Sequence, residues 1–145
     1  MSYDPDEALK LKNQICFPLY AAARRVVSMY TPYLKPLGLT YTQYITFMVL
    51  WEKDGLSVSE ICSCLQLDSG TVTPLLKKME AEGWVERRRS KNDERRVDIY
   101  LTDAGRAMKK KVADVPLKVG SCFQMEPAQA QELYNLLYAI LGDAK

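Results

Sequence analysis

A change of hydrophobic period at Trp84 constrains the fold of this chain more than any other feature. Upstream of it, apolar residues recur at helical spacing: Val72, Leu75, Leu76 and Met79. Downstream, two runs with a period of two, 84–89 and 97–101, flank a polar turn at 90–93. Two such runs around a polar turn predict a β-hairpin. Helices followed by one short hairpin predict a mainly α-helical chain with a small β wing (α+β).

Helix caps place further helices before the hairpin. Two pairs of residues form capping boxes, which start helices: Thr40 with Gln43, and Ser57 with Glu60. A tight turn at 67–70 then leads into a helix that ends at the C-cap Gly83, and Pro74 is expected within or near its first turn, where proline is tolerated. A short helix, a tight turn, a second helix and a hairpin predict a winged helix-turn-helix.

Helices with an apolar stripe are predicted at both ends of the chain. The first carries a stripe of heptad type: Ile15, Leu19, Ala22, Val26 and Met29. It is expected to end at Thr31-Pro32. Another helix should run from Asp103 to about residue 120, with Pro116 able to bend it, and the last should open at Pro127.

The heptad-type spacing suits packing against the helices of another copy, so we expect a homodimer. One winged module alone binds DNA weakly, which also favours a dimer. The expected organisation is a single domain over 1–145, with dimerisation helices at 1–37 and 103–145 and a winged helix-turn-helix lobe at 40–101.

The absence of histidine narrows the function classes. It removes the usual catalytic base, Ser-His and Cys-His nucleophile pairs and most zinc sites. The acidic N-terminus is no secretory signal, and no apolar run approaches the roughly 20 residues of a membrane-spanning helix. We therefore expect a cytoplasmic binding protein with no metal or cofactor, not an enzyme. Cys62 and Cys64 form a C-x-C pair on different helix faces and are interpreted as packing residues.

The positive charge is concentrated in one stretch. Residues 77–96 contain eight basic and five acidic residues, a net +3, whereas the whole chain carries only +2. A basic patch on a nearly neutral body is typical of a nucleic-acid contact. On charge alone, a solvated charged turn explains the pattern equally well.

The winged lobe predicts how double-stranded DNA is contacted. The helix after residue 68 fits the major groove, and the hairpin reaches the adjacent minor groove, where an arginine inserts. Arg95 or Arg96 is the expected insert, and Asp93 is expected to hold an arginine in place. A two-fold dimer predicts a pseudo-palindromic operator. The candidate DNA-contacting residues are Ser69, Thr71, Thr73, Pro74, Lys77, Lys78, Arg87, Arg89, Lys91, Asp93, Arg95 and Arg96.

Three stretches carry a resemblance to a known family. They are 67–80 (LDSGTVTPLLKKME), Asp93-Glu94-Arg95-Arg96 and Leu101-Thr102-Asp103-Ala104-Gly105. Together they resemble the MarR family of dimeric winged-helix regulators over nearly the whole chain. The segment 15–20 (ICFPLY) is similar to that of the organic-hydroperoxide-sensing OhrR branch. The resemblance implies a repressor that leaves its operator when organic hydroperoxides oxidise a cysteine.

The resemblance also implies the parts of the sensor. Cys16 is the expected sensor thiol, and Tyr30 and Tyr41 match positions that supply hydroxyls to it across the dimer interface. Tyr20 lies four residues on, so on the same helix face. Phenol donors favour the thiolate form. Pro18 leaves two readings open: it bends a continuing helix beside the thiol, or the helix restarts there and Cys16 lies near a helix N-terminus.

Cys122 determines the expected chemistry. A sulfenic acid on Cys16 can be captured by a second thiol as a disulfide. Some members of the branch carry a resolving cysteine in this region of the other subunit, and others use a small cellular thiol. Cys122 is therefore a possible resolving residue, and the alternative is an idle thiol.

Three other readings remain. The same fold could sense a small aromatic ligand instead of a peroxide. Cys16 could turn over as a thiol peroxidase, although no Arg or His lies near it in the sequence. A winged helix that binds only protein fits poorly with the basic patch.

Overall fold

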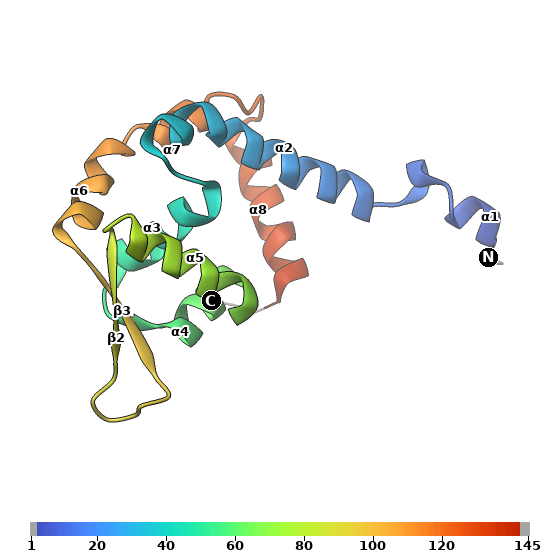
Figure 1. Ribbon diagram of the computed structural model, residues 1–145. Coiled ribbons are helices and arrows are strands. Elements are labelled where there is room, and N and C mark those ends of the chain that lie inside the picture. Colours follow the sequence, from blue (N-terminus) through green and yellow to red (C-terminus); the bar gives the residue numbers. More distant parts are fainter. Residues whose placement is uncertain (1–2, 143–145) are drawn as a thin grey trace.

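The computed structural model describes residues 3–142, so the outermost residues of both expected dimerisation segments, 1–2 and 143–145, lie outside it. Figure 1 shows its arrangement. The helices are α1 (Pro5–Ala8), α2 (Cys16–Leu34), α3 (Tyr41–Glu52), α4 (Val58–Leu65), α5 (Ser69–Ala81), α6 (Asp103–Lys111), α7 (Val115–Gly120) and α8 (Pro127–Leu141). The strands are β1 (Leu56–Ser57), β2 (Val85–Arg89) and β3 (Val97–Leu101).

The predicted hairpin is confirmed, and a third strand joins it. β2 and β3 pair antiparallel, with Arg87 opposite Ile99, and form the wing that projects from the lobe in Figure 1. β1 pairs with the other edge of β3, with Ser57 opposite Asp98, to give the order β1-β3-β2. β1 was not predicted, because its two residues are too few to show an alternation.

The core of the lobe lies between the sheet and helices α3, α4 and α5. Side chains from all four are fully buried there: Phe47, Ile61, Val72, Leu76, Met79 and Ile99. The apolar residues of α5 thus face inward as its spacing predicts. The helix-turn-helix, α4 and α5, is anchored by this packing.

The predicted helix caps are present. Both capping boxes form, at Thr40 and at Ser57, and Gly83 follows α5 with a φ of 75°. The expected position of Pro74 is wrong. Asp68 caps α5, so Pro74 is its sixth residue and lies in the second turn. Its side chain is exposed, and the helix continues with the loss of one backbone hydrogen bond.

Two further helix boundaries differ from those predicted. α2 does not end at Thr31-Pro32 but continues to Leu34, with exposed Pro32 inside it. The helix expected from Asp103 to about residue 120 is two helices, because α6 ends at Lys111 and α7 begins at Val115. Pro116 occupies the first turn of α7, where its missing N–H costs nothing.

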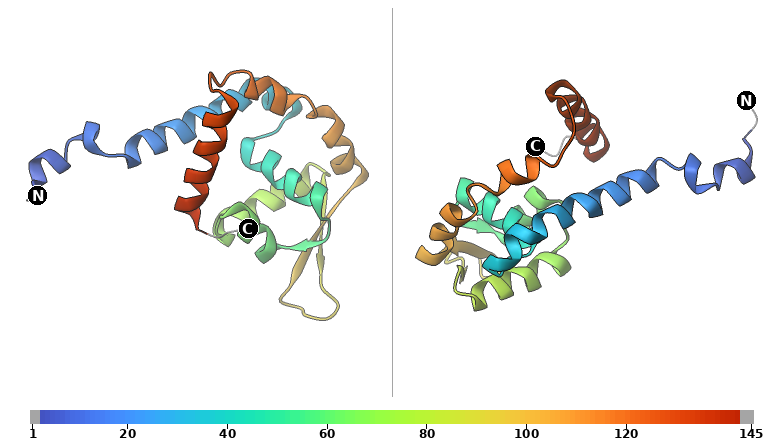
Figure 2. Two further views of the ribbon diagram at one scale, coloured as in Figure 1. Left: turned by 180° about the vertical axis from the view of Figure 1, so that it is seen from behind. Right: turned by 90° about the horizontal axis from the view of Figure 1, so that it is seen from above.

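The terminal helices bury almost nothing. Leu34 is the one buried residue of α2, and α8 has none. Figures 1 and 2 show α1 and the first half of α2 extending away from the lobe. Large apolar side chains are exposed on these helices and at their ends: Ile15, Phe17, Leu19, Tyr20, Val27, Leu133, Tyr134, Leu136, Tyr138 and Ile140. Across residues 3–142, no helix combines the length and apolar character needed to cross a membrane.

Candidate nucleic-acid interface and thiol site

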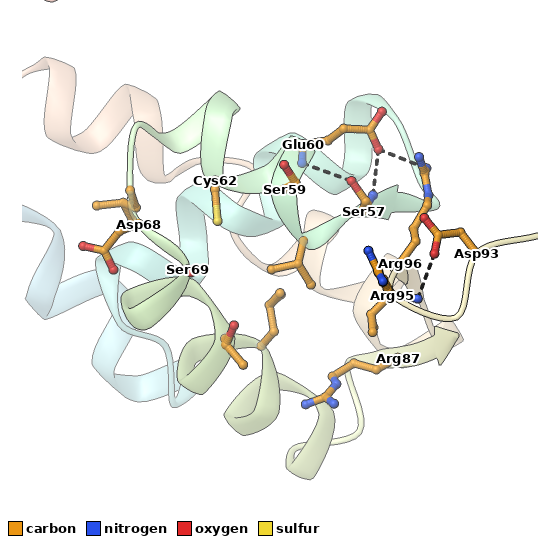
Figure 3. A pocket seen from close by; sticks show the side chains of 15 residues that line it. Ser57, Ser59, Glu60, Cys62, Asp68, Ser69, Arg87, Asp93, Arg95 and Arg96 are labelled. Atoms are coloured by element: carbon orange, nitrogen blue, oxygen red, sulfur yellow. Dashed lines mark hydrogen bonds and ion pairs between the residues drawn. The ribbon is translucent and has the colours of Figure 1, made fainter. Parts of the chain in front are cut away.

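A groove of about 770 Å³ separates α4 and the start of α5 from the wing. Figure 3 shows Ser59, Asp68 and Ser69 on one side and the wing arginines on the other. The groove is lined by Ser57, Val58, Ser59, Glu60, Cys62, Leu67, Asp68, Ser69, Thr73, Leu76, Arg87, Asp93, Arg95, Arg96 and Val97. The groove thus brings predicted DNA-contacting residues of α5 and of the wing to one face.

The polar face of α5 points outward. The expected contact residues Ser69, Thr71, Lys77 and Lys78 are exposed, and Thr73 is half-buried. Asp68 accepts a hydrogen bond from the Thr71 backbone N–H at 2.8 Å, which fixes the start of the helix. The lysines near the end of α5 are therefore available to phosphates.

The wing cations fall into two groups. Some are paired with carboxylates: Arg87 with Glu80 at 3.7 Å, Arg88 with Glu86 at 2.6 Å, and Arg96 with both Glu60 and Asp98. Arg89, Lys91 and Arg95 are exposed and form no ion pair within residues 3–142. Of the two expected inserts, Arg95 is thus the unpaired one.

Asp93 shapes the wing turn through the backbone. Its Oδ1 accepts a hydrogen bond from the Arg95 backbone N–H at 2.9 Å, and its carbonyl accepts one from the Arg96 N–H at 3.0 Å. The predicted contact of Asp93 with an arginine side chain is absent within residues 3–142, because the short turn brings its carboxylate onto the adjacent N–H group. Asp93 therefore presents the arginines by fixing the turn.

Cys16 is the first residue of α2 and is exposed. Pro18 is the third residue of the helix, where no intrahelical partner is needed for its nitrogen. The second reading of Pro18 therefore holds, and the thiol lies at a helix N-terminus. One turn further, Tyr20 is 60% exposed and its ring contacts the Arg24 guanidinium at 5.5 Å.

Tyr30 and Tyr41 belong to a cluster of three phenols. Their ring centroids lie 4.9 Å apart, and the ring of Tyr44 lies 5.6 Å from Tyr30 and 6.3 Å from Tyr41. Burial, and then the neighbouring Tyr30, raise the pKa of Tyr41; burial, Tyr30 and Tyr41 raise that of Tyr44. The Tyr41 and Tyr44 phenols therefore stay protonated and able to donate. Sequence reasoning missed Tyr44, which is 3% exposed and resembles an ordinary core residue.

The phenol cluster cannot reach the thiol of its own chain. Tyr30 is 14 residues after Cys16 in the same helix. At a rise of about 1.5 Å per residue, the two are about 21 Å apart along the axis.

Cys122 is also remote from Cys16 within one chain. It is exposed just after α7, and its thiol contacts the Lys118 carbonyl at 3.5 Å. The Lys118 ammonium lies 5.6 Å from the ring of Tyr33, near the C-terminal end of α2. Cys122 is thus at the opposite end of α2 from Cys16, far beyond the Cα separation of about 7 Å that a disulfide allows.

The remaining cysteines differ from each other. Cys62 is half-buried and packs against the core, as interpreted, but Cys64 is exposed, so its interpretation as a packing residue is wrong. Within residues 3–142, no group of three or more Cys, Asp or Glu side chains is arranged to hold a metal ion.

Comparison with known proteins relates the chain to transcriptional regulators. The family model "Transcriptional regulator SarA/Rot" matches residues 28–112. The chain is 41% identical over 133 residues to the organic hydroperoxide resistance transcriptional regulator of Bacillus subtilis (92% of this chain, 90% of that protein). It is 51% identical over 132 residues to the regulator TtmR of Methylorubrum extorquens (91% and 68%).

Solved structures of AbfR from Staphylococcus epidermidis are also similar. Reduced AbfR bound to DNA matches with a TM-score of 0.78 and 34% identity, covering 93% of this chain and 94% of AbfR. Overoxidised AbfR bound to DNA gives 0.77 and 34%, covering 95% and 97%. The disulfide form of AbfR gives 0.65 and 35%, covering 94% and 96%.

Proposed function

Since the chain belongs to the MarR family of winged-helix transcriptional regulators, we propose that it is a homodimeric repressor switched by the oxidation of Cys16. In this proposal the reduced dimer binds a pseudo-palindromic operator, and organic hydroperoxides release it. The thiol is oxidised once per response and does not turn over as an enzyme.

The DNA-binding part of the proposal is supported by the face around the groove. The exposed hydroxyls and lysines of α5 enter the major groove, and the wing lies along the backbone with Arg95 in the minor groove. Arg89 and Lys91 add unpaired positive charge. AbfR, which the chain resembles over most of its length, binds DNA in two of the solved structures.

The dimer is supported by the exposed apolar surface of α2 and α8. These helices expose most of their large apolar side chains in a single chain, and exposed apolar surface of this kind is typical of a protein–protein interface. A second copy covers it with the same surface, as a two-fold axis requires. Such a dimer holds two α5 helices about 34 Å apart, one turn of DNA.

The sensor part of the proposal rests on one observation. The Cys16 thiol and its expected partner Tyr30 lie at opposite ends of the exposed helix α2. In a two-fold pair of antiparallel α2 helices that cross near Ala23, Cys16 of one chain faces the partner's Tyr30. The same symmetry brings the partner's Tyr41 and Cys122 to that end. Phenol donors and the helix N-terminus then stabilise the thiolate.

Oxidation proceeds in two balanced steps. The Cys16 thiolate attacks the terminal oxygen of a hydroperoxide, an S–O bond forms, the O–O bond breaks, and the alkoxide leaves with a proton as the alcohol. The sulfur has then lost two electrons as a sulfenic acid. The partner's Cys122 thiol attacks it, a disulfide forms, and the hydroxyl leaves as water.

The disulfide changes the separation of the two DNA-binding lobes. In the proposed dimer the disulfide joins Cys16, at the start of α2, to the partner's Cys122, just after α7, so its formation shifts α2 of one chain against α7 of the other. α7 packs on α2, and α2 in turn packs on α3 of the lobe, so the shift reaches α5. Losing a few phosphate contacts on one half-site lowers affinity by orders of magnitude at physiological salt.

Fluorescence anisotropy with the duplex upstream of the gene for this protein tests the proposal. Reduced protein should bind tightly, and cumene hydroperoxide should weaken binding by about a hundredfold or more. Cys16→Ser should bind equally tightly with and without oxidant. Cys64→Ser is the matched control, since Cys64 is also exposed but belongs to α4 of the lobe, and it should respond like the unmodified chain. Tight binding that ignores oxidant would overturn the sensor.

A further inference from the structure

The wing is joined to the helix-turn-helix at one polar junction. Ser57 ends β1, pairs with Asp98 of β3, and is also the N-cap of α4. Glu60, in the first turn of α4, completes the capping box. The root of the wing and the start of α4 therefore meet within a few residues.

Arg96 connects the two sides of this junction (Figure 3). Its Nη2 lies 3.2 Å from Oε2 of Glu60, and its Nε lies 2.6 Å from Oδ1 of Asp98. The same Oε2 of Glu60 accepts a hydrogen bond from the Ser57 backbone N–H at 2.8 Å. One carboxylate oxygen thus joins the helix cap to an arginine of the wing.

The backbone of Arg96 closes the wing turn. Its N–H donates to the Asp93 carbonyl at 3.0 Å, and its carbonyl accepts from the Ser90 N–H at 2.9 Å. Arg96 directly precedes β3. Its main chain therefore belongs to the turn while its side chain is held by α4, so the direction of the turn depends on the Glu60 contact.

We propose that Arg96 is a positioning residue that fixes the wing against α4 so that Arg95 meets the minor groove, and that Arg96 is not itself a DNA contact. The inference rests on the proposed DNA-binding function. The planar guanidinium holds its Nη2 and Nε in a fixed geometry toward two separate carboxylates, which the single nitrogen of a lysine does not reproduce. The Arg96 and Glu60 side chains are each 44% exposed, so their ion pair adds little to folding stability. Its effect is on the orientation of the wing.

Glu60→Gln separates this account from simple electrostatics by the sign of its effect. Removing a negative charge beside bound DNA strengthens binding if only charge matters. The positioning account predicts operator binding about five- to twentyfold weaker, because both wings of a dimer lose their ion pair. Glutamine still completes a capping box, so α4 keeps its start.

Glu94→Gln is the matched control. Glu94 lies in the same wing, is exposed and forms no ion pair within residues 3–142, so the charge change is identical without loss of the junction. It should bind as tightly as the unmodified chain or more tightly. Equal effects of Glu60→Gln and Glu94→Gln would overturn the proposal.

Arg96→Lys keeps the positive charge but removes the two guanidinium nitrogens that contact Glu60 and Asp98. Binding at least as weak as that of Glu60→Gln is expected, with no further loss when Glu60→Gln is added to Arg96→Lys, since both variants remove the Arg96–Glu60 pair. Arg96→Lys binding like the unmodified chain would show a simple phosphate contact and would overturn the positioning role.

A readout without DNA separates the two proposals. Hydrogen exchange of the segment 90–101 should be several-fold faster in Glu60→Gln and Arg96→Lys than in Glu94→Gln. Unchanged exchange in the first two contradicts the positioning role whatever the DNA data show. If the unmodified chain does not bind the duplex, the proposed function fails, while the exchange rates still decide the junction.

Discussion

The winged lobe buries its apolar residues within one chain, whereas the terminal helices leave theirs exposed. Phe47 and Met79 of the lobe have no exposed surface, but Ile140 of α8 is 67% exposed and Ile15 before α2 is 83% exposed. The two regions have similar residue types, so the difference lies in what each can pack against. The lobe thus has a core within the single chain, and the proposed dimer gives the exposed apolar residues of the terminal helices a second chain to pack against.

The contrast between the two regions is tested most strongly by placing a charged residue in a terminal helix. Leu136→Asp should make the free energy of dimerisation less favourable by about 4 kcal/mol or more, because a symmetric interface would then bury two unpaired carboxylates. Sedimentation equilibrium measures the change. The circular dichroism spectrum of the variant should show that the lobe keeps its helices. A dimer of unchanged affinity would show that α8 is not in the interface.

The lobe is tested by a substitution in its core. Phe47 contacts Trp51 and Trp84, with ring centroids at 5.1 and 5.6 Å, so Phe47→Ala should lower the free energy of unfolding by about 3–5 kcal/mol. Urea titration followed by tryptophan fluorescence measures it. The surface control Met48→Ala, at a 42% exposed site in the same helix α3, should change stability by less than about 1 kcal/mol.

Tyr44 lies between the two regions, because it is buried in the lobe and packs on Tyr30 of α2. Tyr44→Leu should slow Cys16 oxidation about tenfold, a change of about 1.4 kcal/mol in the barrier, since Tyr30 and Tyr41 lose the ring that orients them. Tyr44→Phe keeps the ring and should be slowed less. Dimedone labelling followed by mass spectrometry gives the rates. An unchanged rate in Tyr44→Leu would remove the cluster from the sensor.

The smallest expected effect concerns the junction within the lobe. Hydrogen bonding to Ser57, mainly from its backbone, and the Arg96 charge lower the pKa of Glu60 below its ordinary 4.5. A lowered pKa means that the carboxylate stabilises the fold above about pH 4.5, and that this contribution is lost as pH falls through the folded-state value. The small stability difference between the unmodified chain and Glu60→Gln should therefore be constant from pH 6 to 8, on the order of 1 kcal/mol or less. Thermal melts measure this difference, and a difference that changes between pH 6 and 8 would contradict the prediction.

Local patterns predicted most of the winged lobe. The hairpin, the capping boxes and the inward face of α5 follow from residues close together in the sequence. Pro32 and Pro74 were misplaced, because a proline on an exposed face costs a helix only one hydrogen bond and packing of the rest offsets it. The pattern could not show β1, whose two residues are defined by their partner strand.

The site residues that the sequence left open depend on contacts between distant segments. Arg95 and Arg96 are adjacent and chemically identical, and they are distinguished by the carboxylates of Asp98 and of Glu60, 36 residues earlier, which pair with Arg96 and not with Arg95. Tyr44 joins Tyr30 because α3 packs against α2. The separation of Cys16 from Tyr30 follows from the unbroken helix between them, which the spacing of its apolar residues did predict.

The central claim is that the sensor is assembled from two chains, and a mixed dimer tests it most directly. Differently tagged Cys16→Ser and Cys122→Ser chains are co-expressed, and the mixed dimer is purified and treated with cumene hydroperoxide. Non-reducing mass spectrometry should find one link between Cys16 of one chain and Cys122 of the other, which neither homodimer can form. A mixed dimer without this link, together with a Cys16–Cys122 link inside single chains of the unmodified protein, would contradict the account.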